Sequence, residues 1–587
     1  MIVLGYSGLD AAVRHALSQA DLRPGEERMV QGLDSAAALV IDGEVVAAVA
    51  EERFCDEKHT NRFPEQAIRY CLATAGIGIE DVASIAHGFD YRRGQAFFRR
   101  FDQRYYDEVL APDNQLLLWR NRFAGQFRDD QYRPVVHHLA HAASAYFPSG
   151  YERALCIVCD GMGELESLTA YTVDAGRFTR LGIISIPNSI GLLYSIITRH
   201  LGFSFNADEY KLMGLAPYGD PARYRAFFAN LVELHADGRY QLHYERWLGT
   251  VADDHQHRAV LAYLEHEVLT APGDVDAMSQ AHYDFAAAAQ EVLETALTHT
   301  LSHWQSTSGM RRLCMAGGVA LNCTFNGKLL SQALFDDVFI QPAAGDDGTA
   351  LGAALLTAAE LGDVPCCGKY QEMPFYGPSF SSAEILVAAR AFGERIEVTE
   401  FASVEGAAED AAQGVADDLV QAWFQGRMEF GPRALGNRTI FANPASPDIK
   451  SRVNQIVKLR EGFRPFAPAV LVERADEYFA IGGGAPPFEF MLATCQVRPA
   501  WAPRLPGITH VDGSARVQTV DQCKNPQFYD LIERIGRKTG IYCTLNTSFN
   551  VRGQAMIAAP DTAIETFLRV KLDRLYLQNI RVTKPQH

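Results

Sequence analysis

The sequence has 587 residues and an acidic composition, in which 71 aspartates and glutamates outnumber 54 lysines and arginines for a formal net charge of −17. Hydrophobic residues make up 48% of the chain, which is typical of a globular protein with room for roughly two to four domains. The negative balance argues against a nucleic-acid or membrane partner, because binding to phosphate-rich surfaces needs clustered lysine and arginine. Scattered cysteines, with neither a signal peptide nor a long apolar run, predict a reduced, cytoplasmic protein.

Two β-hairpins are predicted in the N-terminal part of the chain, and each is followed by a helix. The first hairpin spans 35–51, where two apolar runs flank an Asp-Gly turn, and the second spans 153–186. Helical patterns begin near Pro64 after the first hairpin and near Ile190 after the second. This repeated order predicts a duplicated structural unit.

Helices and strands then alternate along the chain. A long alanine-rich segment at 277–304 is predicted to be helical, and a strand at 312–316 follows it. A further strand ends in the sequence GDDG, just before an alanine-rich helix at 349–361. Such alternation predicts an α/β architecture.

The composition changes over 363–380, where proline, glycine and adjacent cysteines replace the regular pattern. We place a domain boundary in this stretch, because boundaries fall where periodicity is lost and turn-forming residues gather. The predicted domains are 1–365 and 366–587. The second domain again mixes strands and helices and carries several motifs that contain arginine.

The clearest local motif is HHLAH at 137–141, at the start of a helical segment. His137 and His141 are four residues apart, so on a helix they share a face and can bind one metal ion. Asp160 and Asp346 each follow a strand, and carboxylates at strand ends of an α/β sheet point into the ligand crevice. Two imidazoles and two carboxylates form a hard, mixed donor set suited to Fe(II), Mn(II) or Zn(II). A helix that merely carries several histidines, and aspartates that only form turns, remain open alternatives.

Two further sets of residues suggest phosphate binding. Gly317-Gly318 and Asn322 follow a strand and open a helix, where backbone N–H groups can cradle a phosphate. Arginine forks also match phosphate oxygens, although surface arginines paired with local acids would give the same pattern. The cationic residues set among glycines and prolines in the second domain are Arg433, Lys458, Arg464 and Arg516.

Taken together, these motifs resemble the O-carbamoyltransferase family of nodulation-factor, cephamycin and tobramycin biosynthesis. The resemblance runs through most of the chain, with many separate motifs in the family's order. The matching segments are DSAAALVIDGEVVAAVAEERF at 34–54, Lys58-His59, HHLAHAASAYFPS at 137–149, DGMGE at 160–164, GLLYSIIT at 191–198, DEYKLMGLAPYG at 208–219, AGGVALN at 316–322, GDDGTALGAA at 345–354 and the C-terminal arginine motifs.

The resemblance implies a fold and an activity. The N-terminal domain is expected to have the duplicated, actin-like ATPase fold of the tRNA threonylcarbamoyl transferases, and the C-terminal domain an α/β fold that makes carbamoyl adenylate. Carbamoyl phosphate and ATP, the latter with magnesium, are the implied co-substrates. An iron ion in the N-terminal domain is implied to hold the intermediate for attack by a hydroxyl of a small-molecule acceptor, as in antibiotic biosynthesis.

The resemblance also implies roles for individual residues. His137, His141, Asp160 and Asp346 match the family's iron ligands, and Lys58 matches a position on the acceptor side. The residues implied to bind carbamoyl phosphate and ATP are Arg433, Lys458, Arg464, Arg516, Asn546 and Ser548. Those expected to line the site for the nucleotide or carbamoyl adenylate are Gly161, Gly163, Lys211, Gly317, Gly318 and Asn322.

One position departs from the family pattern. The family usually has His-Asp just before SAAAL, and that histidine is assigned to activation of the acceptor hydroxyl, whereas this chain has Leu33-Asp34. Leucine cannot act as a base. His15, which lies in the longer segment before this motif, and Asp34 are our candidates to replace it as catalytic residues. An acceptor that needs less activation is the third explanation.

Other functions fit parts of the pattern. A tRNA threonylcarbamoyl-type transferase disagrees with the acidic charge, and a nucleotide-gated binding module has no use for both a metal site and a phosphate site. A metallohydrolase disagrees with the phosphate-binding residues. The segment 89–127, rich in arginine and aromatic residues, either contributes to an acceptor pocket or forms a solvated amphipathic helix. The acceptor and the oligomeric state are not specified by the sequence.

Overall fold

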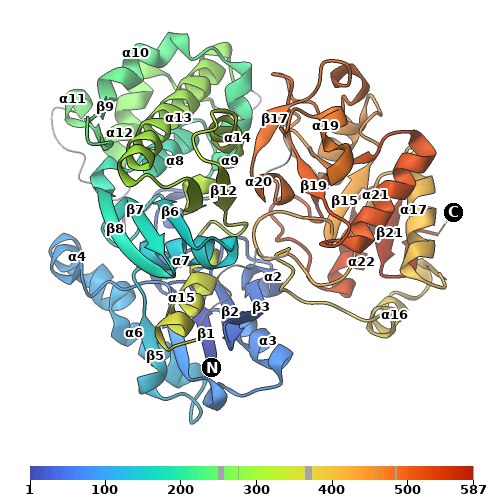
Figure 1. Cartoon of the computed structure of the whole chain (residues 1–587), viewed down its shortest axis with the longest axis horizontal. Helices are drawn as coiled ribbons and strands as arrows, with labels where there is room; N and C mark the ends of the chain where they lie inside the picture. The colour runs from blue at the N-terminus through green and yellow to red at the C-terminus, as the bar shows by residue number, and fades with distance from the viewer. Residues whose placement is uncertain (249–256, 275–276, 364–372, 459, 483–485, 586–587) are drawn as a thin grey trace. The chain divides into compact units, whose positions relative to one another are not determined.

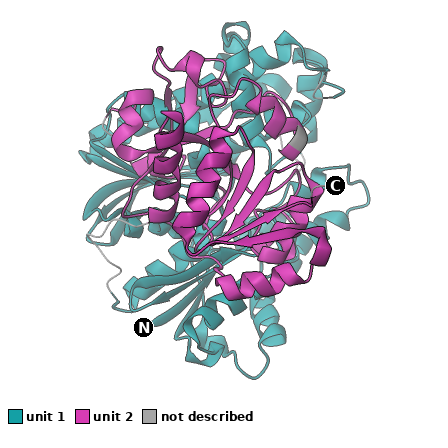
Figure 2. Cartoon of the chain, turned by 90° about the vertical axis from the view of Figure 1, so that its right-hand side faces the viewer, with its two compact units in different colours: residues 1–51, 59–370 teal, residues 52–58, 371–587 magenta. Residues whose placement is uncertain are grey.

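Figure 1 shows the fold as a computed structural model, which describes residues 1–248, 257–274, 277–363, 373–458, 460–482 and 486–585. The chain divides into two compact units, which Figure 2 shows in separate colours. Unit 1 comprises 1–51 and 59–370, and unit 2 comprises 52–58 and 371–587. The predicted boundary between residues 365 and 366 lies outside the described residues. The sequence predicted two consecutive domains, whereas in the structure the short segment 52–58 groups with unit 2.

The first sheet of unit 1 has the strand order β3-β2-β1-β4-β5. Its central strand β1 is antiparallel to β2 and parallel to β4. Strands β2 and β3 form the predicted hairpin, and Asp42 and Gly43 adopt positive φ angles of 51° and 81° at its turn. The bounds are β1 Ile2–Tyr6, β2 Ala36–Ile41, β3 Glu44–Ala50, β4 Ser84–His87 and β5 Tyr132–Pro134.

The second sheet of unit 1 repeats this pattern with the order β12-β11-β6-β7-β8. Its central strand β6 is antiparallel to β7 and parallel to β11. The equivalent order and orientation of strands confirm the predicted duplication and the actin-like α/β fold. The bounds are β6 Arg153–Cys159, β7 Glu166–Asp174, β8 Arg177–Ser185, β11 Arg312–Ala316 and β12 Asp337–Ile340.

Helices α7 (His137–Ser149) and α15 (Asp347–Glu360) pack against each other between the two sheets, as Figure 1 shows. Helix α15 lies on β1 and β2, and α7 lies on β6 and β11. Small residues make this packing close, because a Cβ atom at Gly352 would lie 1.8 Å from the carbonyl oxygen of Ala140. The close packing fixes the start of each helix relative to the ends of the strands.

The other helices of unit 1 surround this centre. The helices that were predicted to follow the two hairpins are present as α3 and α8, and the alanine-rich helices predicted at 277–304 and 349–361 are α13 and α15. Their bounds and those of the other helices used below are α1 Ala12–Leu17, α3 Glu65–Ala75, α4 Gln95–Phe101, α6 Pro112–Arg122, α8 Ile190–His200, α9 Glu209–Leu215, α10 Ala222–Leu231, α13 Gln280–Ser308 and α14 Cys323–Ser331. Among the described residues, we find no helix with the length and apolar character needed to cross a membrane.

Unit 2 is built on a mixed sheet with the order β13-β22-β21-β14-β15-β20-β16-β19. Helices α17 (Val404–Ala416) and α21 (Pro526–Thr539) pack against each other and onto this sheet. Alanines of α17 and large apolar residues of α21 form a buried core with Trp423 and Tyr576 from the strands. The strand bounds are β13 Glu397–Glu400, β14 Gln421–Phe424, β15 Arg438–Ala442, β16 Ala467–Leu471, β19 Gln518–Val520, β20 Cys543–Ser548, β21 Arg574–Leu577 and β22 Ile580–Thr583, with the separate pair β17 Thr494–Gln496 and β18 Ser514–Arg516.

Candidate metal centre and anion site

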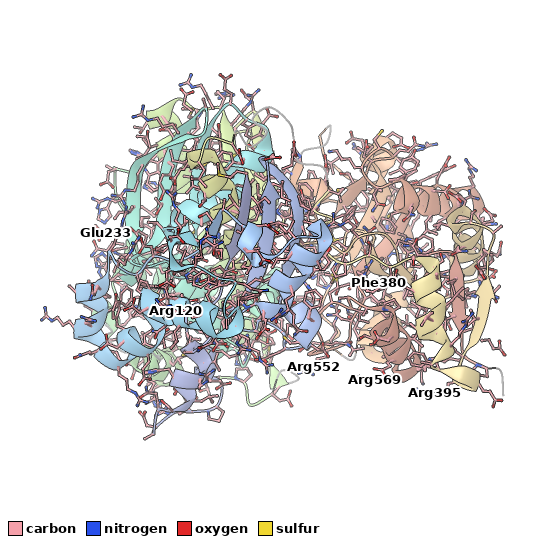
Figure 3. All side chains as sticks on the ribbon, turned by 90° about the horizontal axis from the view of Figure 1, so that it is seen from below. Arg120, Glu233, Phe380, Arg395, Arg552 and Arg569 are labelled. Carbon is pink, nitrogen blue, oxygen red and sulfur yellow. The ribbon has the colours of Figure 1, made fainter. Side chains whose placement is uncertain are left out.

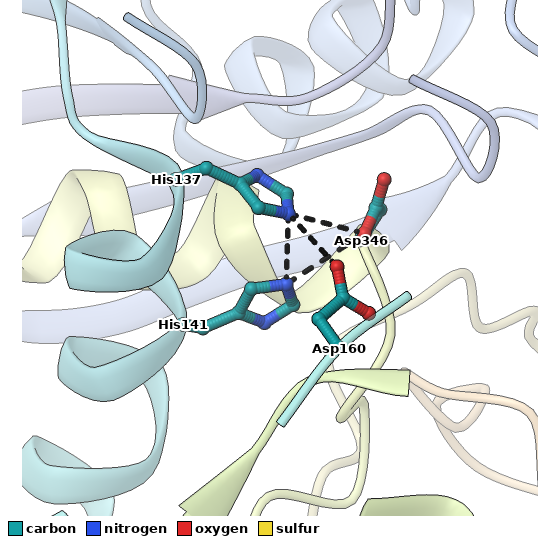
Figure 4. Close-up of side chains that lie close together, drawn as sticks. All are labelled: His137, His141, Asp160 and Asp346. Carbon is teal, nitrogen blue, oxygen red and sulfur yellow. Dashed lines mark hydrogen bonds and ion pairs between the residues drawn. The ribbon is translucent and has the colours of Figure 1, made fainter. Parts of the chain in front are cut away.

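The four residues predicted to bind a metal lie together in unit 1, as Figure 4 shows. Nε2 of His137 lies 3.4 Å from Oδ2 of Asp160 and 3.4 Å from Oδ1 of Asp346. Nε2 of His141 lies 3.6 Å from the same oxygen of Asp346 and 3.1 Å from Nε2 of His137. All of these donor atoms lie within 4.8 Å of one another.

These separations fit a single metal ion. Donor atoms bound at about 2.0–2.2 Å from one divalent ion are separated from one another by about 3.0–3.5 Å. The imidazole nitrogens face each other and the two carboxylates, an arrangement that a shared cation stabilises. The residues therefore fit a hard, mixed nitrogen and oxygen site of the predicted kind.

Backbone contacts orient His137 at the start of α7. Its Nδ1–H donates a hydrogen bond to the carbonyl oxygen of Gly88 at 3.0 Å, which leaves Nε2 as the donor atom toward the cluster. The ring stacks on Phe89, with centroids 4.3 Å apart and planes at 13°. His141 follows one turn later on the same face of the helix.

Glu164 holds the first turn of α7 in place. Its Oε1 accepts hydrogen bonds from the backbone amides of His137 and Asp90, each at 2.8 Å. Burial raises the pKa of the Glu164 carboxyl to about 7. Its Oε2 has no hydrogen-bond partner among the residues that the structure describes. The sequence did not single out Glu164 by itself, although it lies in the DGMGE motif.

Asp160 directly follows strand β6 and is oriented by the glycines at 317 and 318. The amide of Gly318 donates a hydrogen bond to Oδ1 of Asp160 at 2.9 Å, while the other carboxylate oxygen faces His137. Gly317 has a φ of 92°, and a Cβ atom there would lie 2.3 Å from the carbonyl oxygen of Cys159. Only glycine fits this approach, so the glycine pair supports Asp160.

The charges in the cluster depend on one another. Burial lowers the pKa of the His137 imidazole, but the carboxylates of Asp346 and Asp160 outweigh burial and raise it well above its ordinary value. Burial and the nearby His137 lower the pKa of His141. Burial raises the pKa of the Asp160 carboxyl, but the imidazoles of His137 and His141 lower it overall. Both carboxylates are therefore held ionised next to positive charge, as in a site for a cation.

The polar residues that the sequence predicted around the nucleotide make local contacts in the structure. Asn322 caps α14, because its Oδ1 accepts the amide of Phe325 at 3.0 Å, and its Nδ2 donates to Gln290 at 3.0 Å. Nζ of Lys211 forms an ion pair with Asp208 at 3.0 Å. For these residues nucleotide binding stays a prediction.

The glycines at 161 and 163 have contacts of the same local kind. The carbonyl oxygen of Gly161 accepts a hydrogen bond from the Ser189 hydroxyl at 2.6 Å. The carbonyl oxygen of Gly163 accepts one from Nε2 of Gln31 at 2.5 Å. These contacts shape the turn after β6, and a role for this turn in nucleotide binding also stays a prediction.

The two candidates for the missing base differ in their surroundings. His15 is buried on α1, where Nδ1 lies 3.1 Å from Oε2 of Glu108 and Nε2 lies 3.1 Å from Nε2 of Gln19. These contacts are with residues outside the metal cluster. Asp34 instead accepts a hydrogen bond from Nδ1–H of His59 at 2.7 Å. In the sequence, His59 stands out only as part of the Lys58-His59 motif, and its pairing with Asp34 across 25 positions gives no local signal.

In unit 2, the buried Lys458 contacts one of the other predicted phosphate-binding residues, Ser548. Nζ of Lys458 donates to the carbonyl oxygens of Ser548 and Asn550 at 2.7 and 2.8 Å. Burial lowers the pKa of Lys458 well below its ordinary value, and the positive charges of Arg460, Arg464 and Lys58 lower it further. Such mutual repulsion is relieved when an anion binds.

The loop that carries Arg433 is held by buried polar side chains. Oε1 of Glu429 accepts the amides of Leu435 and Asn437, each at 2.8 Å. Nδ2 of Asn546 donates to the carbonyl oxygen of Ala434 at 3.2 Å. Asn546 thus supports the loop next to Arg433, and Ser548, on the same strand β20, contacts Lys458.

Arg464 and Arg516 are the other two cationic residues predicted to bind phosphate. Arg464 forms an ion pair with Glu461 at 3.3 Å and adds to the positive charge around Lys458. Arg516 ends strand β18 and pairs with Thr494 in its two-stranded ladder. A direct role of Arg464 and Arg516 in binding phosphate stays a prediction.

The arginine-rich segment 89–127 forms surface ion pairs. Arg99 on α4 lies 3.0 Å from Asp107, and Nε of Arg120 on α6, labelled in Figure 3, donates to Asp129 at 3.0 Å. These pairs are about half exposed. The contacts favour the solvated alternative for this part of the segment, while an acceptor pocket here stays a prediction.

Comparisons with known proteins find two matching sequence profiles and several curated relatives. The sequence profile described as Carbamoyltransferase N-terminus matches residues 30–355, and the profile described as Carbamoyltransferase C-terminus matches residues 412–584. The chain is 39% identical over 565 residues to "Nodulation protein NolNO" of Sinorhizobium fredii, covering 94% of this chain and 80% of that protein. It is 42% identical over 452 residues to "Nodulation protein NolO" of Bradyrhizobium diazoefficiens, covering 76% of this chain and 78% of that protein.

Similarity extends beyond the nodulation proteins. "Uncharacterized protein sll1178" of Synechocystis is 36% identical over 599 aligned positions, covering 94% of this chain and 95% of that protein. Among solved structures, HypF of T. kodakarensis gives a TM-score of 0.31 at 14% identity over 62% of this chain, a likeness too distant to carry an argument. Both profiles and the relatives at 36–42% identity lead to one conclusion: the chain belongs to the carbamoyltransferase family.

Proposed function

We propose that this carbamoyltransferase makes carbamoyl adenylate from carbamoyl phosphate and ATP, and transfers the carbamoyl group to a hydroxyl of a small-molecule acceptor. Membership of the family does not specify the intermediate, the metal ion or the class of acceptor, and these three features are proposed here. The observation that carries it is the buried Lys458 among Arg460, Arg464 and Lys58, where burial and then neighbouring positive charge lower the pKa of the ammonium. In a chain of net charge −17, such a cluster indicates a site for a highly charged anion.

The chemistry explains why the chain would use ATP. A carbamate is a poor acyl donor, and joining it to AMP supplies a good leaving group. The cations near Lys458, together with Arg433, would hold carbamoyl phosphate and the ATP phosphates and stabilise charge that develops during adenylation. ATP is expected to carry Mg²⁺, which this proposal does not assign to protein ligands.

The metal centre in unit 1 supports the transfer half of the proposal. His137 and His141 would hold the ion through Nε2, and Asp160 and Asp346 through carboxylate oxygens. We propose Fe(II), with Mn(II) and Zn(II) as alternatives that the same donors fit. When bound, the ion supplies Lewis-acid polarisation of a carbonyl or phosphoryl oxygen. The protein holds the two histidines on one face of α7, which fixes their position before the ion arrives.

The proposed acceptor is a natural product with a free hydroxyl, in tailoring reactions of the antibiotic type. Similarity to nodulation proteins supports a role in natural-product tailoring. The net charge of −17 supports a small molecule over a nucleic acid, because a polyphosphate chain would be repelled.

The test is the activation half-reaction without an acceptor. The purified protein is incubated with ATP, carbamoyl phosphate and Fe(II), and mass spectrometry follows carbamoyl adenylate, AMP and pyrophosphate. We expect AMP and pyrophosphate to form only when carbamoyl phosphate is present. Arg433→Ala and Arg464→Ala should lower this rate at least about 100-fold, because each removes a charge from the phosphate site.

A matched control is Arg395→Ala, since Arg395 is an exposed arginine of unit 2 far along the chain from these motifs and is labelled in Figure 3. Its rate should equal that of the unaltered protein. Hydrolysis of ATP to ADP at a rate that is independent of carbamoyl phosphate would contradict the proposed function. A nucleotide-gated binding role would then be the better account.

A further inference from the structure

We propose that His59, held by Asp34, is the general base that removes the proton from the acceptor hydroxyl. The inference rests on the proposed function, because it assigns a residue to the transfer step. Leu33, which precedes Asp34, is buried and apolar and cannot take a proton. Attack by a neutral alcohol on a carbamoyl group needs a base within hydrogen-bond reach. The His59–Asp34 pair supplies the chemistry that this step requires.

The geometry of the pair sets the basic atom. Nδ1–H of His59 donates to Oδ1 of Asp34 at 2.7 Å, so Nε2 is the basic nitrogen of the neutral ring. The carboxylate orients the ring and stabilises the imidazolium that forms when the ring takes a proton. The side chains of His59 and Asp34 are 22% and 33% exposed, while Nε2 of His59 itself is buried, so an acceptor hydroxyl has to enter the site to reach it.

A rigid backbone holds the two residues together. The amide and the hydroxyl of Ser35 both donate to the carbonyl oxygen of Thr60 at 3.0 Å, which ties the residue after Asp34 to the residue after His59. Asp34 and His59 adopt positive φ angles of 57° and 56°, a region that non-glycine residues seldom occupy. Such strain persists where the surrounding structure imposes it, and it concentrates at functional sites.

The pair lies at the same edge of the first sheet as the metal centre. The hydroxyl of Ser7, just beyond the end of β1, donates to the carbonyl oxygen of Asp34 at 3.2 Å. On the other side of β1, the amide of Gly88 donates to Tyr6 at 3.0 Å, and the carbonyl oxygen of Gly88 accepts from His137. Asp34 and Gly88 therefore flank the end of β1, about two strand spacings or about 10 Å apart.

The His59–Asp34 pair and the Gly88 contact of the metal centre therefore lie at the same end of β1. In the transfer step, the acceptor O–H bond breaks and its proton moves to Nε2 of His59. A new bond forms between the acceptor oxygen and the carbamoyl carbon. The bond from that carbon to the AMP phosphate oxygen breaks, and its electron pair leaves with AMP. The products are the O-carbamoyl acceptor, AMP and a proton on His59, which solvent then removes.

His15 is less suited to this role. One ring nitrogen of His15 lies 3.1 Å from Glu108, and the other lies 3.1 Å from Gln19. Neither contact is with a residue at the end of β1. Asp34 therefore acts as a positioning residue and His59 as the catalytic residue. The assignment also accounts for the presence of Asp34 without a histidine at position 33.

The experiment separates transfer from activation. Activation is measured as carbamoyl-phosphate-dependent exchange of labelled pyrophosphate into ATP, which requires no acceptor. Transfer is measured with glycerol as the probe acceptor, by mass spectrometry of its carbamate, and with water as the competing acceptor, by release of ammonia. Both probes lose a proton on attack, so the same comparison applies to each product. The variants are His59→Ala, Asp34→Asn and His15→Ala, with the exposed His266→Ala as the matched control.

We expect His59→Ala to keep the exchange rate within about twofold and to lose at least about 100-fold in transfer. Added imidazole should restore part of the lost rate, which a purely structural defect would not allow. Asp34→Asn should lower kcat for transfer at least about tenfold while KM for glycerol stays unchanged, because Asp34 orients the base. His15→Ala should lose far less transfer activity than His59→Ala, and His266→Ala should transfer at the rate of the unaltered protein.

Three outcomes would overturn the inference in distinguishable ways. Transfer by His59→Ala at the unaltered rate, with exchange intact, removes His59 from the mechanism and leaves the proposed function standing. Absence of exchange in the unaltered protein removes the proposed function itself. Loss of both exchange and transfer in His59→Ala, without rescue by imidazole, shows a structural role and also overturns the assignment.

Discussion

The backbone amide of Gly318 donates a hydrogen bond to Oδ1 of Asp160 at 2.9 Å, although 158 positions separate the two residues in the chain. The contact turns one carboxylate oxygen of Asp160 away from the cluster and leaves the other facing His137. A glycine pair that the sequence associated with phosphate therefore has a defined structural task at the metal centre. Loss of a hydrogen bond that orients a metal ligand commonly lowers metal affinity by about 10–100-fold.

We predict that Gly318→Ala weakens metal binding by about tenfold or more. The added Cβ would lie 3.2 Å from Oδ1 of Asp160, which pushes the carboxylate from its place. Titration of the metal-free protein with Co(II), followed by visible absorption, measures the affinity. Gly161→Ala is the matched control, because its Cβ has no neighbour closer than 3.9 Å. Equal affinities for the two variants would show that the Gly318 contact is dispensable.

A second prediction compares adjacent aspartates. Asp346→Asn should lower Co(II) affinity at least about 100-fold, because Asp346 faces both histidines of the cluster. Asp347→Asn should bind nearly as well as the unaltered protein, since Oδ1 of Asp347 accepts the amide of Gly348 in the first turn of α15. Metal content per chain after dialysis provides an independent measure. Comparable losses in the two variants would contradict the four-residue site.

A third prediction concerns the pH dependence of stability through Glu164. Burial raises the pKa of this carboxyl to about 7 in the folded state, above its ordinary 4.5. The folded state therefore retains a proton that the unfolded state releases, and the stability this provides is lost as pH rises from about 4.5 to about 7. Relative to Glu164→Gln, the free energy of unfolding should fall by about 3 kcal/mol across this window. Urea denaturation of metal-free protein at a series of pH values tests this, and a parallel pH profile for both proteins would refute it.

A fourth prediction concerns proton uptake by Lys458. The pKa of this buried ammonium lies well below its ordinary value in the free protein, and a bound anion would raise it. Binding of carbamoyl phosphate should therefore take up protons, and affinity should decrease as pH rises through the interval between the two pKa values. Calorimetry in buffers of different ionisation enthalpy measures the uptake.

Lys458→Arg is the matched variant for this test, because a guanidinium stays charged throughout the accessible pH range. This variant should bind carbamoyl phosphate no more tightly than the unaltered protein does. Its binding should show no proton uptake at residue 458. Identical uptake in both proteins would assign the titration to another group.

Local pattern was sufficient for much of the fold. The hairpin that turns at Asp42-Gly43, the second hairpin at 153–186, the helices after them and the repeated order of strands were predicted from apolar periodicity and turn residues, and the structure confirms them. Helical spacing alone places His137 and His141 on one face. The ends of strands account for Asp160 and Asp346, because an α/β sheet gathers such ends at a common edge. These rules depend only on residues that are close in sequence or on a shared architecture.

The remaining features depend on packing between distant segments. Assignment of 52–58 to unit 2, the contact of Gly318 with Asp160 and the pairing of His59 with Asp34 have no signature in local sequence. Asn322 shows the same limit, because only the folded chain reveals that its side chain caps α14 and pairs with Gln290. The sequence by itself therefore determined the elements, their order and the chemical types at their ends. Only the tertiary structure decided which polar groups satisfy one another, because each buried donor or acceptor takes whichever partner the packing brings within about 3 Å.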